Sequence, residues 1–361
     1  MKWCLTGWTF LLCFLLTGCG QGLPQTREMD DMTLMRTMGV DAGEKEGEVL
    51  VTVSSGRRAS GIQGEQKPPL ILSAQQSSVA GACQVMEGQS DSQIFYGHLD
   101  QLLLGEELAL RGGVVDVLEH FAWDRDLGLG AQVWLVQGGT ARNAIHTGGE
   151  SGVDDRLTTI LTDSEAGGAE MECTVGEVLN GLLERGTAFV PALAVTEGEH
   201  GMLLERGYGI LHQGTLAFWL TGEESRGLEL SQGHPGEGLL EVGETVVRLN
   251  RAALTCVPVL EEGQLTGLEL DLRLAAWVER PGREEESAAV LEQVVRTRAQ
   301  GWLRAAIERA QKENVDFMGL AAMAGTARPE RWQLLREQWK DSFADLNIQV
   351  ESSVVLSDSG R

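Results

Sequence analysis

The feature that most constrains this chain is its N-terminal segment, an uncharged apolar run that ends in a cysteine. After Lys2, no charged residue occurs from position 3 to position 18. The apolar core, residues 10–16, is as long as the core of a secretory signal and too short to cross a bilayer of roughly 30 Å. Gly20 and Gly22 would also interrupt a longer membrane helix. The run therefore predicts a cleaved export signal.

The end of this run has the form of a lipobox, Leu16-Thr17-Gly18-Cys19. Small residues before the cleaved bond give a peptidase access to the backbone, and the Cys19 thiol can accept a diacylglyceryl group. Two or three acyl chains, at about 0.8 kcal/mol per buried CH₂, hold a protein on a membrane far longer than one chain does. The sequence thus predicts a signal peptide over 1–18 and lipidation, with palmitate among the acyl chains, at Cys19.

Charge excludes one class of partner. The chain carries 53 acidic against 29 basic residues, a formal net charge of −24. Such a surface repels phosphate groups, so nucleic acid is not an expected partner. No later segment is long and apolar enough to span a membrane, so we expect the lipid alone to tether the protein.

The cysteines of the mature chain beyond Cys19 are Cys83, Cys173 and Cys256. Three widely spaced cysteines without a Cys-x-x-Cys pair indicate neither a zinc site nor a disulfide framework. We expect them to be small buried hydrophobic residues.

The N-terminal half of the mature chain predicts a sheet with some parallel strands. A strand is expected at 49–53, a loop at 54–69, a strand at 99–104 and another at 132–136. Between the last two, apolar residues recur at helical spacing, and Gly112-Gly113 should divide that stretch into two helices. Strand, helix and strand in this order are typical of a parallel crossover.

Residues 138–170 are rich in Gly, Asp, Ser and Thr, and we expect a long mobile excursion there. A helix is expected over 174–184. Weak periodicity follows, and it places a domain boundary near 195–200. We therefore expect an N-terminal domain over 19–197 and a C-terminal domain over 198–361, with a subdivision near 250.

The C-terminal half predicts strands followed by helices and one more strand. Apolar runs at 207–211 and 216–220 flank a polar turn and predict a hairpin. The other expected elements are strands at 244–249, 254–260, 268–278 and 348–356, a helix at 284–312 and a helix that begins at Pro329. The fold class expected is α+β, two to three domains with mixed sheets packed against helices.

No catalytic, cofactor-binding or metal-binding residues can be assigned. The histidines, at 98, 120, 146, 200, 212 and 234, form no short-spaced ligand pair, and neither a nucleophile elbow nor a phosphate loop occurs. Glu106 and Glu107 are adjacent, so on a helix they diverge and suit a helix N-terminus better than a catalytic pair. Trp332 and Trp339, two turns apart, are expected in a core. Nothing in the sequence indicates small-molecule binding.

With these segments placed, the chain resembles the Ger(x)C spore-germination family. Arg27-Glu28-Met29-Asp30 after the lipobox is similar to the family's Arg-Glu-(Ile/Leu)-(Asp/Asn), and Met38-Gly39-Val40-Asp41 to its Ala-Leu-Gly-Ile-Asp stretch. His98 followed by Leu104-Gly105-Glu106-Glu107-Leu108-Ala109 resembles its His…Gly-Glu-Glu block, and Gly138-Gly139-Thr140-Ala141 falls where the family has Gly-x-Ala.

The resemblance continues to the C-terminus. Gly209 to Gly227, with Glu224 and Arg226, is similar to a hairpin that leads into Glu-x-Arg-Gly. Asp316-Phe317-x-Gly319 and Pro329-x-x-Trp332 resemble two further family elements. The loops at 54–69 and 142–172 depart from the family's pattern, and Met318-Gly319 replaces its usual aromatic-glycine step.

This resemblance implies a non-catalytic lipoprotein, the C subunit of a nutrient germinant receptor in the spore inner membrane. Its implied partners are the A- and B-type integral-membrane subunits. The main alternative is a lipid-anchored solute-binding protein of a transporter, and a lipoprotein hydrolase is a third. Solute-binding proteins are built from two lobes of repeated βα units, a pattern that the C-terminal half does not show.

Overall fold

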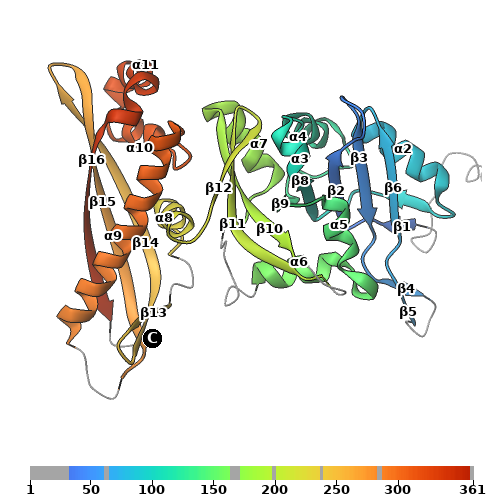
Figure 1. The fold of residues 1–361 in the computed structure, drawn as a ribbon, viewed down its shortest axis with the longest axis horizontal. Coiled ribbons are helices and arrows are strands. Elements are labelled where there is room, and N and C mark those ends of the chain that lie inside the picture. The colour runs from blue at the N-terminus through green and yellow to red at the C-terminus, as the bar shows by residue number, and fades with distance from the viewer. Residues whose placement is uncertain are drawn as a thin grey trace, which may run out of the picture.

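The structure is a computed structural model, and it describes residues 32–60, 65–162, 171–196, 201–235, 239–282 and 287–357. The signal segment, the lipobox and Cys19 lie outside these residues. Two large sheets organise the described chain, one in the N-terminal part and one in the C-terminal part (Figure 1). The expected α+β class with mixed sheets is confirmed.

The larger sheet has eight strands in the order β12-β11-β10-β9-β8-β2-β3-β6. Four neighbours at its centre, β10, β9, β8 and β2, run parallel, and the outer strands are antiparallel. In chain order the strands are β2 (Thr37–Ala42), β3 (Val49–Ser54), β6 (Ile71–Gln76), β8 (Gln101–Gly105), β9 (Gln132–Gln137), β10 (Thr187–Val195), β11 (Leu203–His212) and β12 (Thr215–Leu220).

Helices cover both faces of this sheet because its central strands are buried on both sides. One face packs against α2 (Val79–Gln89), α4 (Val114–Trp123) and α7 (Val175–Arg185). The opposite face packs against α5 (Ala141–His146) and α6 (Val153–Thr162). The short helix α3 (Glu106–Leu110) follows β8 and lies beside β12.

The strand–helix–strand expectation between 99 and 136 is confirmed. β8 and β9 pair in parallel, Leu102 opposite Val133, and Gly112-Gly113 separates α3 from α4. The first strand starts at Gln101 rather than Leu99, because Leu99 closes a turn with its N–H on the carbonyl of Tyr96.

The excursion expected over 138–170 is wrong for the residues that the structure describes. That stretch contains α5 and α6, with a 3₁₀ turn at Gly149–Ser151 between them. Ala141, Ala144, Ile145, Val153 and Leu157 are all fully buried against the sheet. The many Gly, Asp and Thr residues of this stretch conceal two short helices, in which only three (α5) and four (α6) apolar residues indicate the helical period.

The structure also differs from the sequence-based expectations in two smaller sheets of the N-terminal part. The expected loop at 54–69 contains the short strands β4 (Arg58–Ser60) and β5 (Glu65–Lys67), which pair antiparallel. A further two-stranded sheet joins β1 (Met32–Leu34) to β7 (Gln93–Phe95) in parallel.

The hairpin expected around 212–215 is confirmed and belongs to the eight-stranded sheet. β10 pairs with β11 from Thr187 opposite His212 to Val195 opposite Leu203, so the boundary expected near 195–200 separates two neighbouring strands of one sheet. One face of the hairpin, with Leu211 and Leu216, joins the N-terminal core, and the other, with Tyr208 and Leu220, joins the C-terminal core. We propose that the structural division follows Leu220.

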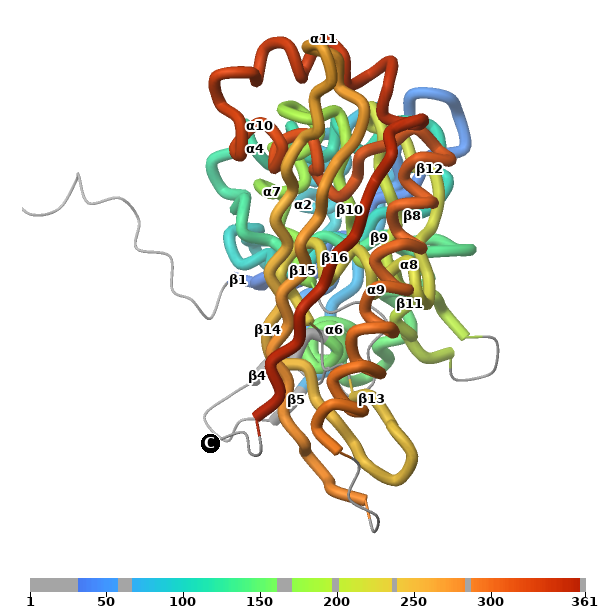
Figure 2. Tube along the Cα trace, turned by 90° about the vertical axis from the view of Figure 1, so that its left-hand side faces the viewer, coloured from blue at the N-terminus to red at the C-terminus, as the bar shows by residue number. Residues whose placement is uncertain are grey.

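The C-terminal sheet has four strands in the order β13-β14-β15-β16. They are β13 (Leu239–Val242), β14 (Thr245–Glu261), β15 (Gln264–Arg280) and β16 (Asn347–Ser357). The strands expected at 244–249 and 254–260 form a single strand, β14, with a register shift between Leu249 and Arg251. The closing strand expected at 348–356 is confirmed as β16, parallel to β15 (Figure 2).

Helices cover one side of this sheet. They are α8 (Glu223–Ser231), α9 (Ala288–Glu313), α10 (Leu320–Ala327) and α11 (Trp332–Ser342). The long helix and the helix near Pro329 were expected, and Pro329 opens a 3₁₀ turn directly before α11. α9 runs along β16 and packs closely on α8 (Figures 1 and 2). No described helix combines the length and the apolar character needed to cross a bilayer.

Candidate functional site

Several motif residues of the N-terminal half lie at the carboxyl ends of the parallel strands, and Asp41 connects β2 to α5. Asp41 is the penultimate residue of β2 and is only 4% exposed. Its Oδ1 accepts the N–H of Ala141 at 2.7 Å, and its Oδ2 accepts the N–H of Arg142 at 2.9 Å. Burial raises the pKa of Asp41, and these two donors oppose that shift. The carboxylate therefore satisfies the first turn of α5 from 100 residues away in the chain.

Two glycines make this approach possible. A β-carbon on Gly105 would lie 2.0 Å from Asp41 Oδ1, and one on Gly39 would lie 2.9 Å from the β-carbon of Ala141. Neither distance leaves room for a side chain. Glycine at both positions lets α5 pack directly onto β2 and β8.

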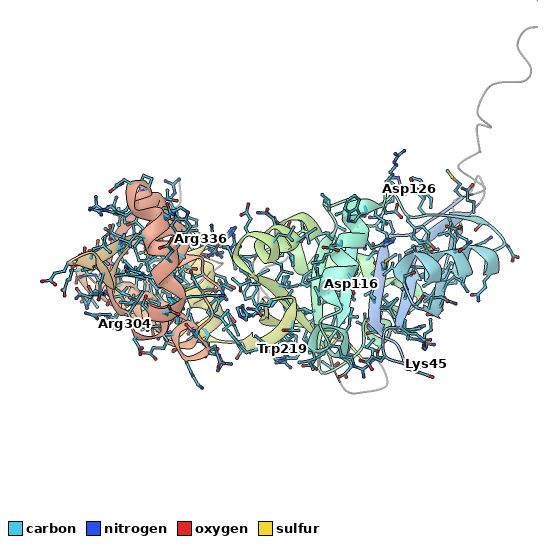
Figure 3. All side chains as sticks on the ribbon, turned by 90° about the horizontal axis from the view of Figure 1, so that it is seen from above. Lys45, Asp116, Asp126, Trp219, Arg304 and Arg336 are labelled. Carbon is cyan, nitrogen blue, oxygen red and sulfur yellow. The ribbon has the colours of Figure 1, made fainter. Side chains whose placement is uncertain are left out.

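Glu106 connects the same region to the edge of the sheet. Its Oε2 accepts the N–H of Gly138 at 2.7 Å, and its Oε1 accepts the indole N–H of Trp219 at 3.1 Å. Trp219 comes from β12 and is labelled in Figure 3. Glu106 lies in the first turn of α3, as the sequence predicts, but its hydrogen bonds go to other elements.

We call Asp41, Gly105, Glu106, Gly138 and Trp219 the carboxyl-edge cluster. Both oxygens of each of its carboxylates accept a hydrogen bond from the protein. These hydrogen bonds connect β2 to α5, and α3 to β12 and to the residue that follows β9. The cluster is therefore suited to holding a shape rather than to proton transfer.

A second group of interacting side chains, which includes Arg226 of the Glu-x-Arg-Gly element, lies where the two sheets meet. Glu229 of α8 is 1% exposed; its Oε1 accepts the hydroxyl of Tyr208 at 2.9 Å, and its Oε2 accepts Nη1 of Arg226 at 2.8 Å. The same Tyr208 oxygen accepts the N–H of Met171 at 3.0 Å. We call Met171, Tyr208, Arg226 and Glu229 the junction network. It joins β11 of the first sheet to the first helix of the C-terminal part.

Close contact between the backbones of α8 and α9 depends on Gly227, the glycine of the Glu-x-Arg-Gly element. A β-carbon there would lie 2.1 Å from the carbonyl oxygen of Trp302 in α9. α8 and α9 can therefore touch only because this position has no side chain. The motif serves helix packing and the junction network together.

The Asp316-Phe317-x-Gly319 element caps α10. Asp316 accepts the N–H groups of Leu320 and Ala321, both at 2.8 Å. Gly319 adopts a φ of +76°, which glycine reaches without strain. Burial raises the pKa of Asp316, and the backbone donors partly offset it. This element too has a structural role.

Among the described residues, the other histidines, cysteines and tryptophans form no common site. Within the described ranges, no three His, Cys, Asp or Glu side chains group as a metal site would require. Cys173 and Cys256 are buried and Cys83 is half-buried, all as free thiols. Burial raises the pKa of Cys83 to about 11 and that of Cys256 to about 12, so neither is an activated thiolate at neutral pH. Trp339 stacks on Phe343, and Trp332 packs against the same core, as expected.

Comparison with known proteins identifies the class. The family model described as "Spore germination protein N-terminal domain" matches residues 25–195, and the one described as "Spore germination B3/GerAC like, C-terminal" matches residues 206–360. Together these matches cover most of the chain and place it among the spore germination proteins. The chain belongs to the Ger(x)C spore-germination family.

Two individual relatives agree with this assignment. Spore germination protein KC of Bacillus subtilis (strain 168) is 19% identical over 402 residues, covering 99% of this chain and 96% of the relative. The crystal structure of the GerBC protein superposes with a TM-score of 0.59 at 15% identity, covering 89% of this chain and 97% of that chain. At that identity the likeness concerns the fold.

Proposed function

We propose that this protein is the non-catalytic lipoprotein C subunit of a spore nutrient germinant receptor. It would act with A- and B-type integral-membrane subunits on the outer face of the spore inner membrane. The observation that carries the proposal is the succession of both family domains behind a lipobox in one chain.

The site geometry supports a structural subunit. Four carboxylates, those of Asp41, Glu106, Glu229 and Asp316, accept hydrogen bonds from the backbone or from side chains of the protein. Groups engaged in this way hold elements in place. A folded body of this kind suits assembly or signalling beside membrane partners.

Lipidation at Cys19 is the part of the proposal that supplies the membrane attachment. A single acyl chain gives only marginal binding, whereas the two or three chains of a bacterial lipoprotein give stable attachment. Twelve residues separate Cys19 from residue 32, the first described residue, so this attachment would keep the folded part near the bilayer.

The experiment is gene deletion followed by complementation in the native spore former. Nutrient-triggered germination should be lost on deletion and restored by the wild-type chain. The Cys19→Ser chain should escape processing, leave the membrane fraction and fail to restore germination. Cys83→Ser, which changes a half-buried free thiol, is the matched control and should behave as wild type.

Two results would contradict the proposal separately. Unchanged germination of the deletion strain on every nutrient, with no paralogue to compensate, would reject the receptor role. Membrane binding of Cys19→Ser as tight as that of wild type would reject the lipid attachment alone.

A further inference from the structure

A cleft of about 840 Å³ opens at the carboxyl ends of β2 and β8, beside the carboxyl-edge cluster. Its walls are the turn that follows β2, the start of α2, the end of α3 and the first two turns of α4. Small-molecule sites have volumes of roughly 300–1,000 Å³ and occur at the carboxyl ends of parallel strands. Both its size and its place in the fold are those of a ligand site.

The floor of the cleft is aliphatic. Val79, Leu108 and Val117 line it and are at most 5% exposed, and the half-buried Ala42 and Val49 complete it. These side chains come from two strands and three helices and belong to the N-terminal core or pack against it. Such a floor suits a short alkyl chain.

The walls carry an excess of negative charge. Glu46, Glu48 and Asp116 line the cleft, with Arg111 as its one lining Lys or Arg. Arg111 is already paired, because its Nε lies 2.8 Å from Oε1 of Glu107. The hydrogen bond from Gln75 lowers the pKa of Glu48, so that carboxylate is ionised at neutral pH.

Two of the acidic side chains that line the cleft, Glu46 and Asp116, are not neutralised by an ion pair among the described residues. Lys45 partly neutralises Glu48 at 3.5 Å, but within the described ranges no ion pair engages Glu46 or Asp116. Figure 3 labels Asp116 on α4 and Lys45 on the turn after β2. These two acids come from different elements, Glu46 from the β2–β3 turn and Asp116 from α4.

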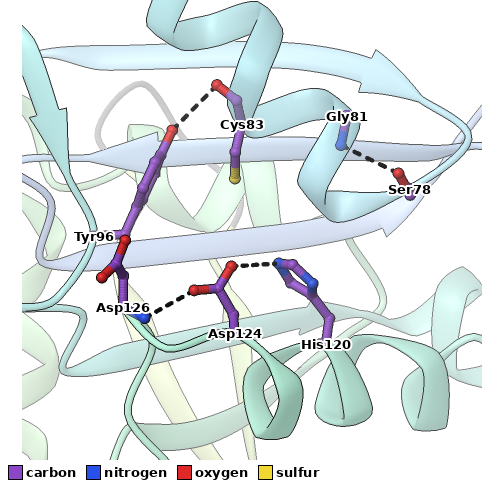
Figure 4. Close-up of polar contacts among 7 residues, drawn as sticks. All are labelled: Ser78, Gly81, Cys83, Tyr96, His120, Asp124 and Asp126. Carbon is purple, nitrogen blue, oxygen red and sulfur yellow. Dashed lines mark hydrogen bonds and ion pairs between the residues drawn. The ribbon is translucent and has the colours of Figure 1, made fainter.

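His120 adds no compensating positive charge. Burial lowers its pKa, and the opposing effect of Asp124, 3.9 Å away, is smaller, so the ring is neutral at neutral pH. Figure 4 shows His120 and Asp124 on one side and the first turn of α2 on the other, where Ser78 caps Gly81. The cleft therefore combines an aliphatic floor with uncompensated carboxylates.

We propose that this cleft is a binding site for a small organic ammonium compound with an aliphatic part. The ammonium group would lie between Glu46 and Asp116, and the alkyl part would cover Val79, Leu108 and Val117. The carboxylates attract an ammonium group by their opposite charge, and the aliphatic floor favours contact with an alkyl group over contact with a hydrated inorganic cation. The inference does not rest on the proposed receptor function.

The test uses the full-length chain in phosphatidylcholine nanodiscs, with empty nanodiscs as the blank. Calorimetric titration with n-pentylammonium should give saturable one-site binding at low salt. Its neutral analogue 1-pentanol should bind at least ten-fold more weakly. Equal binding of the two probes would overturn the proposal, because the carboxylates would then contribute nothing.

Variants separate the cleft from the general negative charge of the protein. Glu46→Gln with Asp116→Asn should weaken n-pentylammonium binding about ten-fold, or about 1.4 kcal/mol. Glu119→Gln with Asp126→Asn removes the same number of charges from positions outside the cleft lining and should change the affinity less than two-fold. Equal weakening by the two double variants, or no saturable binding to wild type, would overturn the proposal.

A steric variant provides an independent check. Ser77 is exposed and lines the cleft, so Ser77→Trp fills it without a change in charge. This variant should keep wild-type unfolding behaviour and lose probe binding. Retained affinity in a folded Ser77→Trp protein would contradict the assigned location.

Discussion

Gly105 faces Asp41 so closely that a β-carbon on Gly105 would lie 2.0 Å from Asp41 Oδ1. Each residue limits the other. Asp41 cannot be replaced without loss of the hydrogen bonds to two N–H groups of α5. Gly105 cannot gain a side chain because the Asp41 carboxylate fills the space beside it. The pair explains why a glycine and an aspartate from two distant sequence motifs occur together.

Gly105→Ala should therefore destabilise the protein by about 2 kcal/mol or more, the range expected for overpacking a buried position. Urea unfolding followed by circular dichroism measures the change. Gly130→Ala is the matched control, because a β-carbon there would meet nothing within 4 Å and its φ is not positive. The control should stay within about 0.5 kcal/mol of wild type, and equal losses for the two variants would contradict the contact.

The junction network predicts strong coupling between Tyr208 and Glu229. Tyr208→Phe removes one donor to a carboxylate that is 1% exposed and should destabilise the protein by about 2–3 kcal/mol. Glu229→Gln in the same chain removes the buried charge, so the double variant should lose less than the sum of the two single losses. A double-mutant cycle in urea measures this coupling, and additive losses would show that the two residues act independently.

The fold could be predicted from the sequence in segments where apolar residues recur regularly over many positions, or where glycines mark the ends of an element. The β8–α3–α4–β9 segment, the β11–β12 hairpin and the long helix α9 were each visible in this way. The helices α5 and α8 were not. α5 has six residues, and its position depends on Asp41, 100 residues earlier, so no local pattern could reveal it.

For the candidate site, the sequence could predict the residues but not their arrangement in space. Gly39, Asp41, Gly105 and Glu106 stood out as motif residues, but sequence spacing cannot show that they meet at one sheet edge. The hydrogen bond from Trp219 to Glu106 joins residues 113 positions apart. The cleft could not be predicted from the sequence, because its acidic residues lie in ordinary surface segments. They line a cleft only because α2 and α4 pack beside them.

The contact between α8 and α9 predicts opposite effects for two glycines. Gly227→Ala would place a β-carbon 2.1 Å from the Trp302 carbonyl oxygen and should separate the helices, with a loss of about 2 kcal/mol or more. Gly301→Ala, on the exposed face of α9, meets nothing within 4 Å and should gain about 0.5–1 kcal/mol of helix stability. Thermal unfolding of both variants tests the contact, and a neutral Gly227→Ala would refute it.

A buried acid predicts an unusual pH dependence. Asp154 is 7% exposed, and its Oδ1 has no hydrogen-bond partner among the described residues. Burial, and next the charge of Asp155, raise its pKa above the ordinary 3.8. Because the folded state holds this proton more tightly than the unfolded state, the contribution of Asp154 to stability is fully present below pH 3.8. It is lost as the pH rises through the higher folded-state pKa.

Asp154→Asn should remove the loss of stability that ionisation of Asp154 causes as the pH rises. The variant should have a higher free energy of unfolding than wild type at pH 7, and the difference should shrink as the pH falls toward 3.8. Urea unfolding at several pH values measures both quantities. Asp155→Asn, an exposed neighbour in the same helix turn, is the matched control and should show a much smaller change. A difference between Asp154→Asn and wild type that stays constant with pH would mean that the Asp154 carboxyl group has the same pKa in the folded and unfolded states.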